Sequence, residues 1–93
     1  MIQTGTAFYD SNTRGWTLNA GTGDRSFTSP DIRFSSPFSA PPTIALALAH
    51  IDSERVRVAL ETFDVQVDEF NIVIKTWADT LLYGVGVTWI AHD

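Results

Sequence analysis

The chain of 93 residues contains no cysteine. This absence excludes a disulfide framework and any thiol chemistry. A small domain without disulfides has few ways to add to a modest core, and association between copies is one of them. The length suits one hydrophobic core, so we expect a single domain over residues 1–93. Since 44% of the residues are hydrophobic and 12% aromatic, we expect a folded rather than a disordered chain.

Basic residues are also scarce, with 6 lysines and arginines against 11 aspartates and glutamates and a formal net charge of −5. Nucleic acids and anionic membranes are bound through basic surfaces that neutralise phosphate groups. The charge balance therefore predicts no nucleic-acid partner.

Long apolar runs are missing as well. No stretch has the length of a membrane-spanning helix, and residues 1–5 lack the positive and apolar regions of a signal peptide. We expect no membrane insertion, a mature chain that begins at Met1, and synthesis in a reducing cytosol. The location where the protein acts stays open: it could remain inside, or be released by lysis or a non-classical route, or a leader could precede these residues.

Histidine is limited to His50, in an apolar stretch, and His92, near the C-terminus. Neither is placed as a general base with an orienting carboxylate, so we expect no enzyme activity. The acidic residues at 52–54 and 64–69 lack the spacing of a calcium loop. We therefore predict no metal or other cofactor. We interpret His50 as a core side chain; a metal site shared by three copies is the alternative.

Helical periodicity is absent over any ten residues, whereas alternation and β-branched residues recur, which predicts an all-β fold. Six strands separated by polar turns are typical of a two-sheet sandwich. We expect Phe70, Ile72 and Ile74 to point inward and Asn71, Lys75 and Trp77, which have the opposite parity, to point outward. Trp16 and Trp89 are expected in the core because large aromatics dominate core burial. The expected strands cover residues 3–9, 31–34, 43–51, 55–61, 70–77 and 85–91.

The run at residues 43–51 is apolar on both faces of a strand. Alternation places Ile44, Leu46, Leu48 and His50 on one side and the three alanines with Ile51 on the other. Because one sandwich core covers only one face, the second face is expected to pack against another copy, where alanines permit close approach. Coverage by loops or by an edge hairpin is the alternative.

Two further stretches bear on function. Residues 55–61 alternate, so Val56, Val58 and Leu60 are expected in the core and Arg57 on the outer face of the strand. Residues 19–30 form a loop rich in Gly, Thr, Ser and Asp, and loops on rigid β scaffolds often carry function.

An ordered set of short fragments resembles the H-type lectin domain, the family of the snail agglutinins and of the C-terminal domain of the discoidins. The fragments run from about Thr4 to Ala91, and their order is more specific than any one of them. They are Gly15-Trp16, Phe34 with Pro37-Phe38, Pro41-Pro42, Ala47-Leu48, Ile51-Asp52, Arg57-Val58, Phe70, Thr76-Trp77 with Asp79-Thr80, and Val87 with Trp89-Ile90.

The resemblance implies a six-stranded antiparallel β-sandwich that assembles as a trimer or as a dimer of trimers. It also implies binding of galactose or N-acetylgalactosamine in shallow clefts between protomers. The sugar contacts of the family fall on Asp24, by chemistry and rough position, on Arg57, and on the aromatic residues Trp77 and Tyr83.

Two departures from the family qualify this interpretation. Ala78 stands where the snail lectin has a sugar-contacting histidine, and Asp10 and Ile74 stand near the positions of its disulfide. The exact sugar is therefore left open by the sequence.

Each candidate residue also has an ordinary structural interpretation. Arg57 could form an ion pair between protomers or lie in solvent, Asp24 could belong to a simple Gly-Asp turn, Trp77 could be an interface residue, and Tyr83 could cap the turn that Asp79 and Thr80 lock. Two functional hypotheses follow: a multivalent lectin, or a trimeric structural or adaptor module, for example on a phage-like particle, that no longer binds sugar.

Overall fold

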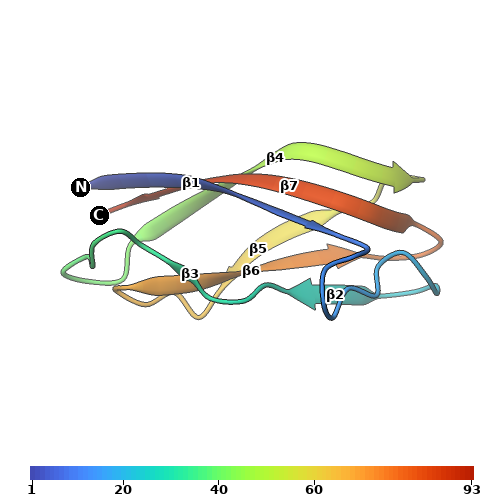
Figure 1. The fold of residues 1–93 in the computed structure, drawn as a ribbon, viewed down its shortest axis with the longest axis horizontal. Helices are drawn as coiled ribbons and strands as arrows, with labels where there is room; N and C mark the ends of the chain where they lie inside the picture. The colour runs from blue at the N-terminus through green and yellow to red at the C-terminus, as the bar shows by residue number, and fades with distance from the viewer.

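The computed structural model describes all 93 residues as two antiparallel sheets packed face to face (Figure 1). The first sheet has the order β1-β7-β4. Its strands are β1 (Ile2–Asp10), β7 (Leu81–His92) and β4 (Thr43–Glu54). β1 is an edge strand of this sheet, since it pairs only with β7.

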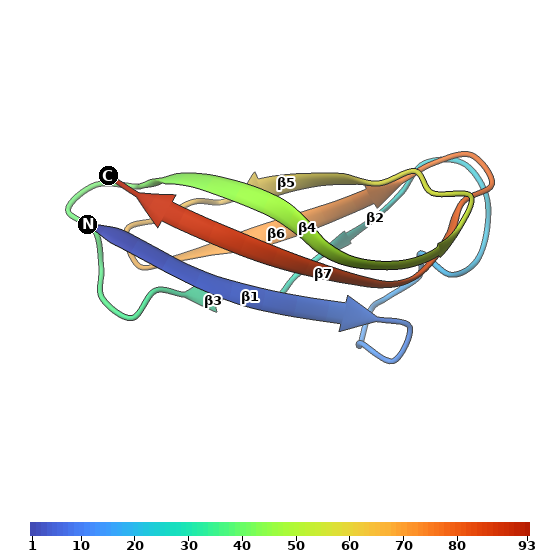
Figure 2. The ribbon, with the colours of Figure 1, turned by 90° about the horizontal axis from the view of Figure 1, so that it is seen from above.

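The second sheet is built around β6 (Glu69–Thr76). On one side β6 pairs first with β2 (Arg25–Thr28) and then with β3 (Ile32–Arg33), and on the other side it pairs with β5 (Ala59–Phe63). Figure 2 shows this sheet lying under the first. The all-β sandwich is confirmed, with seven strands where six were expected. The additional strand, β2, lies in residues 19–30, which the sequence predicted to be loop.

One hydrophobic core fills the space between the sheets. Phe70, Ile72 and Ile74 are fully buried, as their alternation on β6 predicted, and Trp16 and Trp89 are also buried. Trp16 donates its indole N–H to the carbonyl oxygen of Leu82 at 3.0 Å, so its polar atom is satisfied as burial of a tryptophan requires.

Aromatic rings join the two sheets. Phe70 on β6 stacks on Phe34 with ring centroids 5.5 Å apart, and meets Trp89 on β7 edge to face at 5.3 Å. Phe34 also contacts Phe38 and Trp89 edge to face. These are the preferred geometries of aromatic pairs, so this cluster fixes how the sheets sit on each other.

A β-bulge in β4 changes the expected faces of that strand. The register with β7 shifts between Leu48 and His50, so that His50 pairs with Gly86 and Ile51 with Val85. His50 is consequently exposed, its ring 5.3 Å from that of Phe8 on the outer face of the first sheet, and the expectation of a core histidine is wrong. Ile51 packs against the core instead. A bulge places two residues opposite one and thereby reverses the alternation beyond it.

The strand expected at residues 55–61 begins only at Ala59. Arg55 has a positive φ of 55°, which ends β4 and turns the chain before β5. Val56, expected in the core, is 59% exposed, whereas Val58 and Leu60 do pack against the core. Arg57 therefore lies in the connection between two strands and not on the outer face of one.

The molecule is elongated, with extents of 42 × 20 × 19 Å. Both termini lie at one end, where the Met1 amino group bonds to Oδ1 of Asp93 at 2.6 Å. The turns that follow β1 and β6 lie at the other end (Figure 1). The structure has no helix long or apolar enough to span a membrane.

Candidate functional site

The corner between β6 and β7, residues 77–80, is the first part of the candidate site. Ala78 takes a left-handed backbone conformation with φ of 57°, and the Thr80 N–H donates to the Trp77 carbonyl at 3.4 Å. Trp77 follows the last residue of β6 and is 41% exposed, as its outward parity predicted. The turn therefore leaves a large aromatic side chain on the surface.

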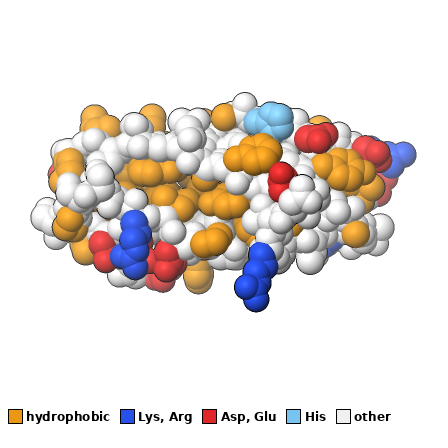
Figure 3. Space-filling view, in the orientation of Figure 1, with side chains coloured by type: hydrophobic (Ala, Val, Ile, Leu, Met, Phe, Trp, Pro, Cys, Tyr) orange, Lys and Arg blue, Asp and Glu red, His pale blue; other side chains and the backbone are white.

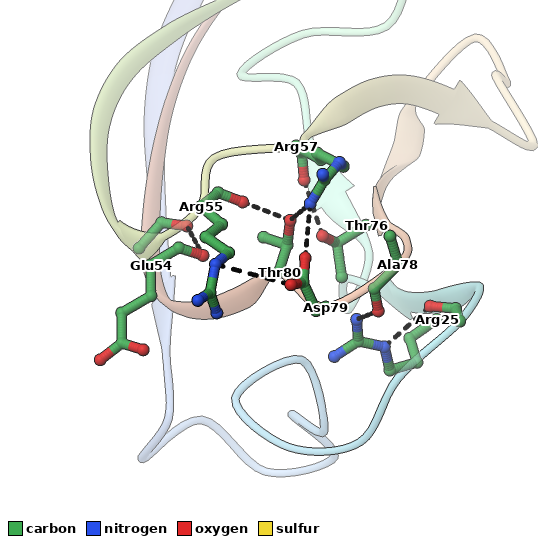
Figure 4. Close-up of polar contacts among 10 residues, drawn as sticks. Arg25, Glu54, Arg55, Arg57, Thr76, Ala78, Asp79 and Thr80 are labelled. Carbon is green, nitrogen blue, oxygen red and sulfur yellow. Dashed lines mark hydrogen bonds and ion pairs between the residues drawn. The ribbon is translucent and has the colours of Figure 1, made fainter.

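Arg57, in the connection between β4 and β5, forms hydrogen bonds that hold this corner in place (Figure 4). Its Nη1 donates to Oδ1 of Asp79 at 2.8 Å and to Oγ1 of Thr80 at 3.1 Å. Its carbonyl oxygen accepts from Oγ1 of Thr76 at 2.6 Å, and Oγ1 of Thr80 donates to the Arg55 carbonyl oxygen. The expected lock at Asp79 and Thr80 is thus confirmed.

The hydrogen bond from Arg57 lowers the pKa of Asp79, and the charge of Arg55, whose Nε lies 3.5 Å from Oδ2, acts in the same direction. Because the pKa of this aspartate is lower in the folded than in the unfolded state, its contribution to stability is present above the unfolded pKa. That contribution is lost as the pH falls through the folded pKa.

Arg25 holds the loop at residues 20–24 against the corner. Its guanidinium donates to three carbonyl oxygens: Nε to Gly23 at 3.0 Å, Nη1 to Ala20 at 2.9 Å and Nη2 to Ala78 at 3.0 Å. The Gly23 N–H donates to the same Ala78 carbonyl at 2.8 Å. Ala78 thus holds the loop through its carbonyl oxygen, and Figure 4 shows Arg25 beside it.

A shallow hollow of ≈ 360 Å³ lies between this loop and the corner. It is lined by Asp24, Arg25, Ser26, Ala59, Lys75, Thr76 and Trp77. Of the four residues that the sequence suggested, the structure brings Asp24 and Trp77 together here. Within one chain, Arg57 and Tyr83 do not line the hollow.

Tyr83 lies on β7 and is half-buried. Burial raises the pKa of its phenol, and the negative charges of Glu54 and Asp52 raise it further. Its carbonyl oxygen accepts from the Ser11 N–H at 2.9 Å. Tyr83 therefore belongs to the acidic end of the β4–β7 pair and not to the corner that it follows in sequence.

Ser26 and Lys75 were not among the predicted site residues. A signal for Lys75 was present, because it shares the outward parity of Trp77 on β6 and precedes it by two positions. Ser26 gave no comparable signal, since it lies on β2, which resembled a loop in sequence. No three His, Asp or Glu side chains come together in a way that could hold a metal ion.

We expect Ala78→Gly to raise the free energy of unfolding by about 0.5–1 kcal/mol. An alanine in the left-handed region costs about 1–2 kcal/mol, and part of the gain is offset by the greater freedom of glycine in the unfolded chain. The midpoint of urea unfolding measures the change. Ala40→Gly is the control, since its φ is not positive; a loss of stability in both variants would contradict the prediction.

Comparison with known proteins agrees with this picture. The model of the H-type lectin domain family matches residues 29–92. A protein of Fuscovulum blasticum described as "ATP synthase subunits region ORF 7" is 32% identical over 81 residues, which cover 82% of this chain; the chain spans 65% of that protein's length.

Two solved structures share the fold. Recombinant discoidin II of Dictyostelium discoideum superposes with a TM-score of 0.84 at 20% identity, over 98% of this chain and 36% of that one. The tailspike gp61 of Pseudomonas phage phi297 superposes with a TM-score of 0.70 at 13% identity, over 98% of this chain and 15% of that one. At these identities, the likeness describes architecture alone.

Proposed function

Because the chain belongs to the H-type lectin domain family, we propose that it binds galactose- or N-acetylgalactosamine-type sugars in the hollow between Asp24 and Trp77. The observation that carries the proposal is that an exposed carboxylate and an exposed indole line one hollow of ≈ 360 Å³. The family and its lectin members favour a binding protein without enzyme activity.

The two side chains supply complementary chemistry. A carboxylate accepts hydrogen bonds from two neighbouring hydroxyls, and such charge-assisted bonds are stronger than neutral ones. Asp24 takes part in none of the ion pairs of the chain, so its oxygens are available to a ligand. The indole of Trp77 offers a flat apolar surface for the C–H face of a sugar ring.

We propose that Arg57 and Tyr83 act at clefts between protomers, as the family resemblance implies. Arg57 uses only Nη1 for Asp79 and Thr80. Its guanidinium has five N–H donors, so those on Nε and Nη2 could reach a sugar held by a neighbouring copy.

The outer face of the first sheet supports association between copies. Small residues, Ala45 and Ala47, are exposed there on β4, and Phe8 and Ile90 are large apolar side chains exposed nearby at 56% and 43%. Hydrophobic side chains also reach the surface in several places in Figure 3. We propose a trimer or a dimer of trimers joined through this face, in which several weak sites gain avidity without new contacts.

Asp24→Asn is expected to weaken the binding of methyl galactoside about 10- to 100-fold, because removing one charged partner of a hydrogen bond costs about 1.5–3 kcal/mol. Isothermal titration calorimetry measures this loss after a glycan array has identified the best sugar. The matched control is Asp64→Asn, an exposed turn residue whose positive φ of 52° asparagine tolerates well. Equal affinities in both variants would exclude Asp24 from the site.

The structural or adaptor module remains the alternative. It predicts that the wild-type chain binds no sugar on the array yet still has a molar mass of several protomers in solution. The fold shared with a phage tailspike is compatible with either function, because one fold can host both.

A further inference from the structure

Lys75 occupies the floor of the hollow. It pairs in register with Ser26 of β2 on one side and with Ala59 of β5 on the other. All three residues line the hollow, whereas Ile74 is buried in the core, so the row faces away from the core. The flanking side chains are small, which leaves the lysine as the one long side chain on this floor.

Most other polar groups of the hollow are already engaged. The Arg25 guanidinium donates to three carbonyl oxygens. Thr76 is buried and its hydroxyl donates to the Arg57 carbonyl. Arg57 itself turns toward the corner and does not line the hollow. Arg25 thus has three of its five N–H groups fixed on backbone carbonyls, whereas Lys75 has a single side-chain partner, Glu61. Lys75 is therefore the less constrained cation of the hollow, and it shares the hollow with the free carboxylate of Asp24.

Lys75 has one partner within the chain. Its Nζ lies 2.9 Å from Oε2 of Glu61, and both side chains are about half exposed. An ammonium group has three donors, so this contact leaves two for a ligand. Exposed ion pairs of this kind are weak and rearrange readily.

We propose that Lys75 is a ligand-binding and specificity-determining residue that donates hydrogen bonds to oxygen atoms of a sugar placed against Trp77. The ligand class is a sugar with neighbouring hydroxyls, one of which donates to Asp24 while the other accepts from Lys75. Such a site lies within one chain and uses Lys75 as the cation where the family resemblance points to Arg57. This inference rests on the proposed sugar-binding function.

Two variants separate ligand binding from a structural role of the ion pair. Lys75→Met and Glu61→Gln each remove the pair, but only Lys75→Met removes the ammonium group. Calorimetric titration with methyl galactoside and methyl N-acetylgalactosaminide should show an affinity about 10- to 100-fold lower for Lys75→Met. Glu61→Gln should bind as well as the wild type or a few-fold more tightly, and Lys75→Arg should retain most of the binding.

Thermal unfolding of Lys75→Met and Glu61→Gln provides the check on folding, and both should melt within a few degrees of the wild type because the ion pair is exposed. Equal losses of affinity in Lys75→Met and Glu61→Gln would overturn the inference in favour of a structural ion pair. Unchanged binding by Lys75→Met would also overturn it while leaving the proposed function intact. A wild-type chain that binds no sugar would instead refute the proposed function, and this inference with it.

Discussion

Phe70→Ala is expected to lower the free energy of unfolding by about 3–5 kcal/mol, the usual cost of truncating a buried phenylalanine. Phe70 is fully buried and contacts the rings of Phe34 and Trp89, which come from opposite sides of the sandwich. Alanine would leave a cavity at the junction of the two sheets. Since small domains are stable by only about 5–15 kcal/mol, a large part of the folded population could be lost at room temperature.

Urea unfolding followed by tryptophan fluorescence measures this loss, supported by thermal unfolding, in which 1 kcal/mol corresponds to about 4–8 °C for a domain of this size. The matched control is Phe63→Ala, the same change at a phenylalanine that is 58% exposed on β5. We expect the control to stay within about 0.5 kcal/mol of the wild type. Similar losses at both positions would show that Phe70 does not join the sheets as described.

Gly5→Ala is expected to cost about 1–3 kcal/mol through overpacking. A Cβ atom at position 5 would lie 2.5 Å from Cζ2, 2.6 Å from Cε2 and 2.8 Å from Nε1 of the Trp89 indole, far inside contact distance. The indole cannot move aside easily, because Phe34 and Phe70 pack against it. Relief of the clash therefore requires β1 to separate from β7 or the aromatic cluster to shift.

Near-ultraviolet circular dichroism reports the environment of the indole, and urea unfolding reports the stability. Gly84→Ala serves as the control in the same strand pair, since a Cβ there would lie 3.4 Å from Cζ of Phe8, an ordinary contact with an exposed ring. We expect little change in the control. An unchanged spectrum and stability in Gly5→Ala would mean that the tryptophan ring adapts.

The regular parts of the sandwich could be predicted from alternation. The parity of β6 predicted the inward set around Phe70 and the outward direction of Lys75 and Trp77. It was wrong for Asn71, which has the same parity as Trp77 but is buried, where its amide donates to the Ser29 carbonyl oxygen. Trp16 and Trp89 were predicted as core on side-chain size alone. In each case, whether the side chain is buried depends on its place in its own strand and on the free energy gained by burying apolar area.

The irregular positions escaped prediction for identifiable reasons. His50 lies on the opposite face from the one predicted because of a β-bulge in β4. The position of a bulge depends on how β4 pairs with β7, and this pairing cannot be deduced from the sequence of β4 alone. Val56 looked like a core residue by alternation, but the left-handed turn at Arg55 delays the next strand to Ala59. β2 was missed because its ladder with β6 is short and its sequence is polar.

The candidate site was predicted only in part, because some of its residues are brought together by strand pairing and loop contacts between distant segments. Asp24 and Trp77 were identified from a family resemblance, and the structure places them in one hollow. The contribution of Ser26 and Ala59 depends on which strands flank β6, so only the three-dimensional pairing could reveal it. The engagement of Arg57 with the corner likewise depends on two loops that are distant in sequence.

The neighbouring positions of Met1 and Asp93 at one end of a 42 Å long molecule also have a practical consequence. A purification tag, a fluorescent dye or a surface linker attached to either terminus would leave the protein at the end opposite the turns that border the hollow. Immobilised in this way, the domain would present its hollow to a solution of glycans. Adjacent termini also favour circular permutation. New termini opened in the turn between β5 and β6 would likewise leave the hollow accessible to ligand.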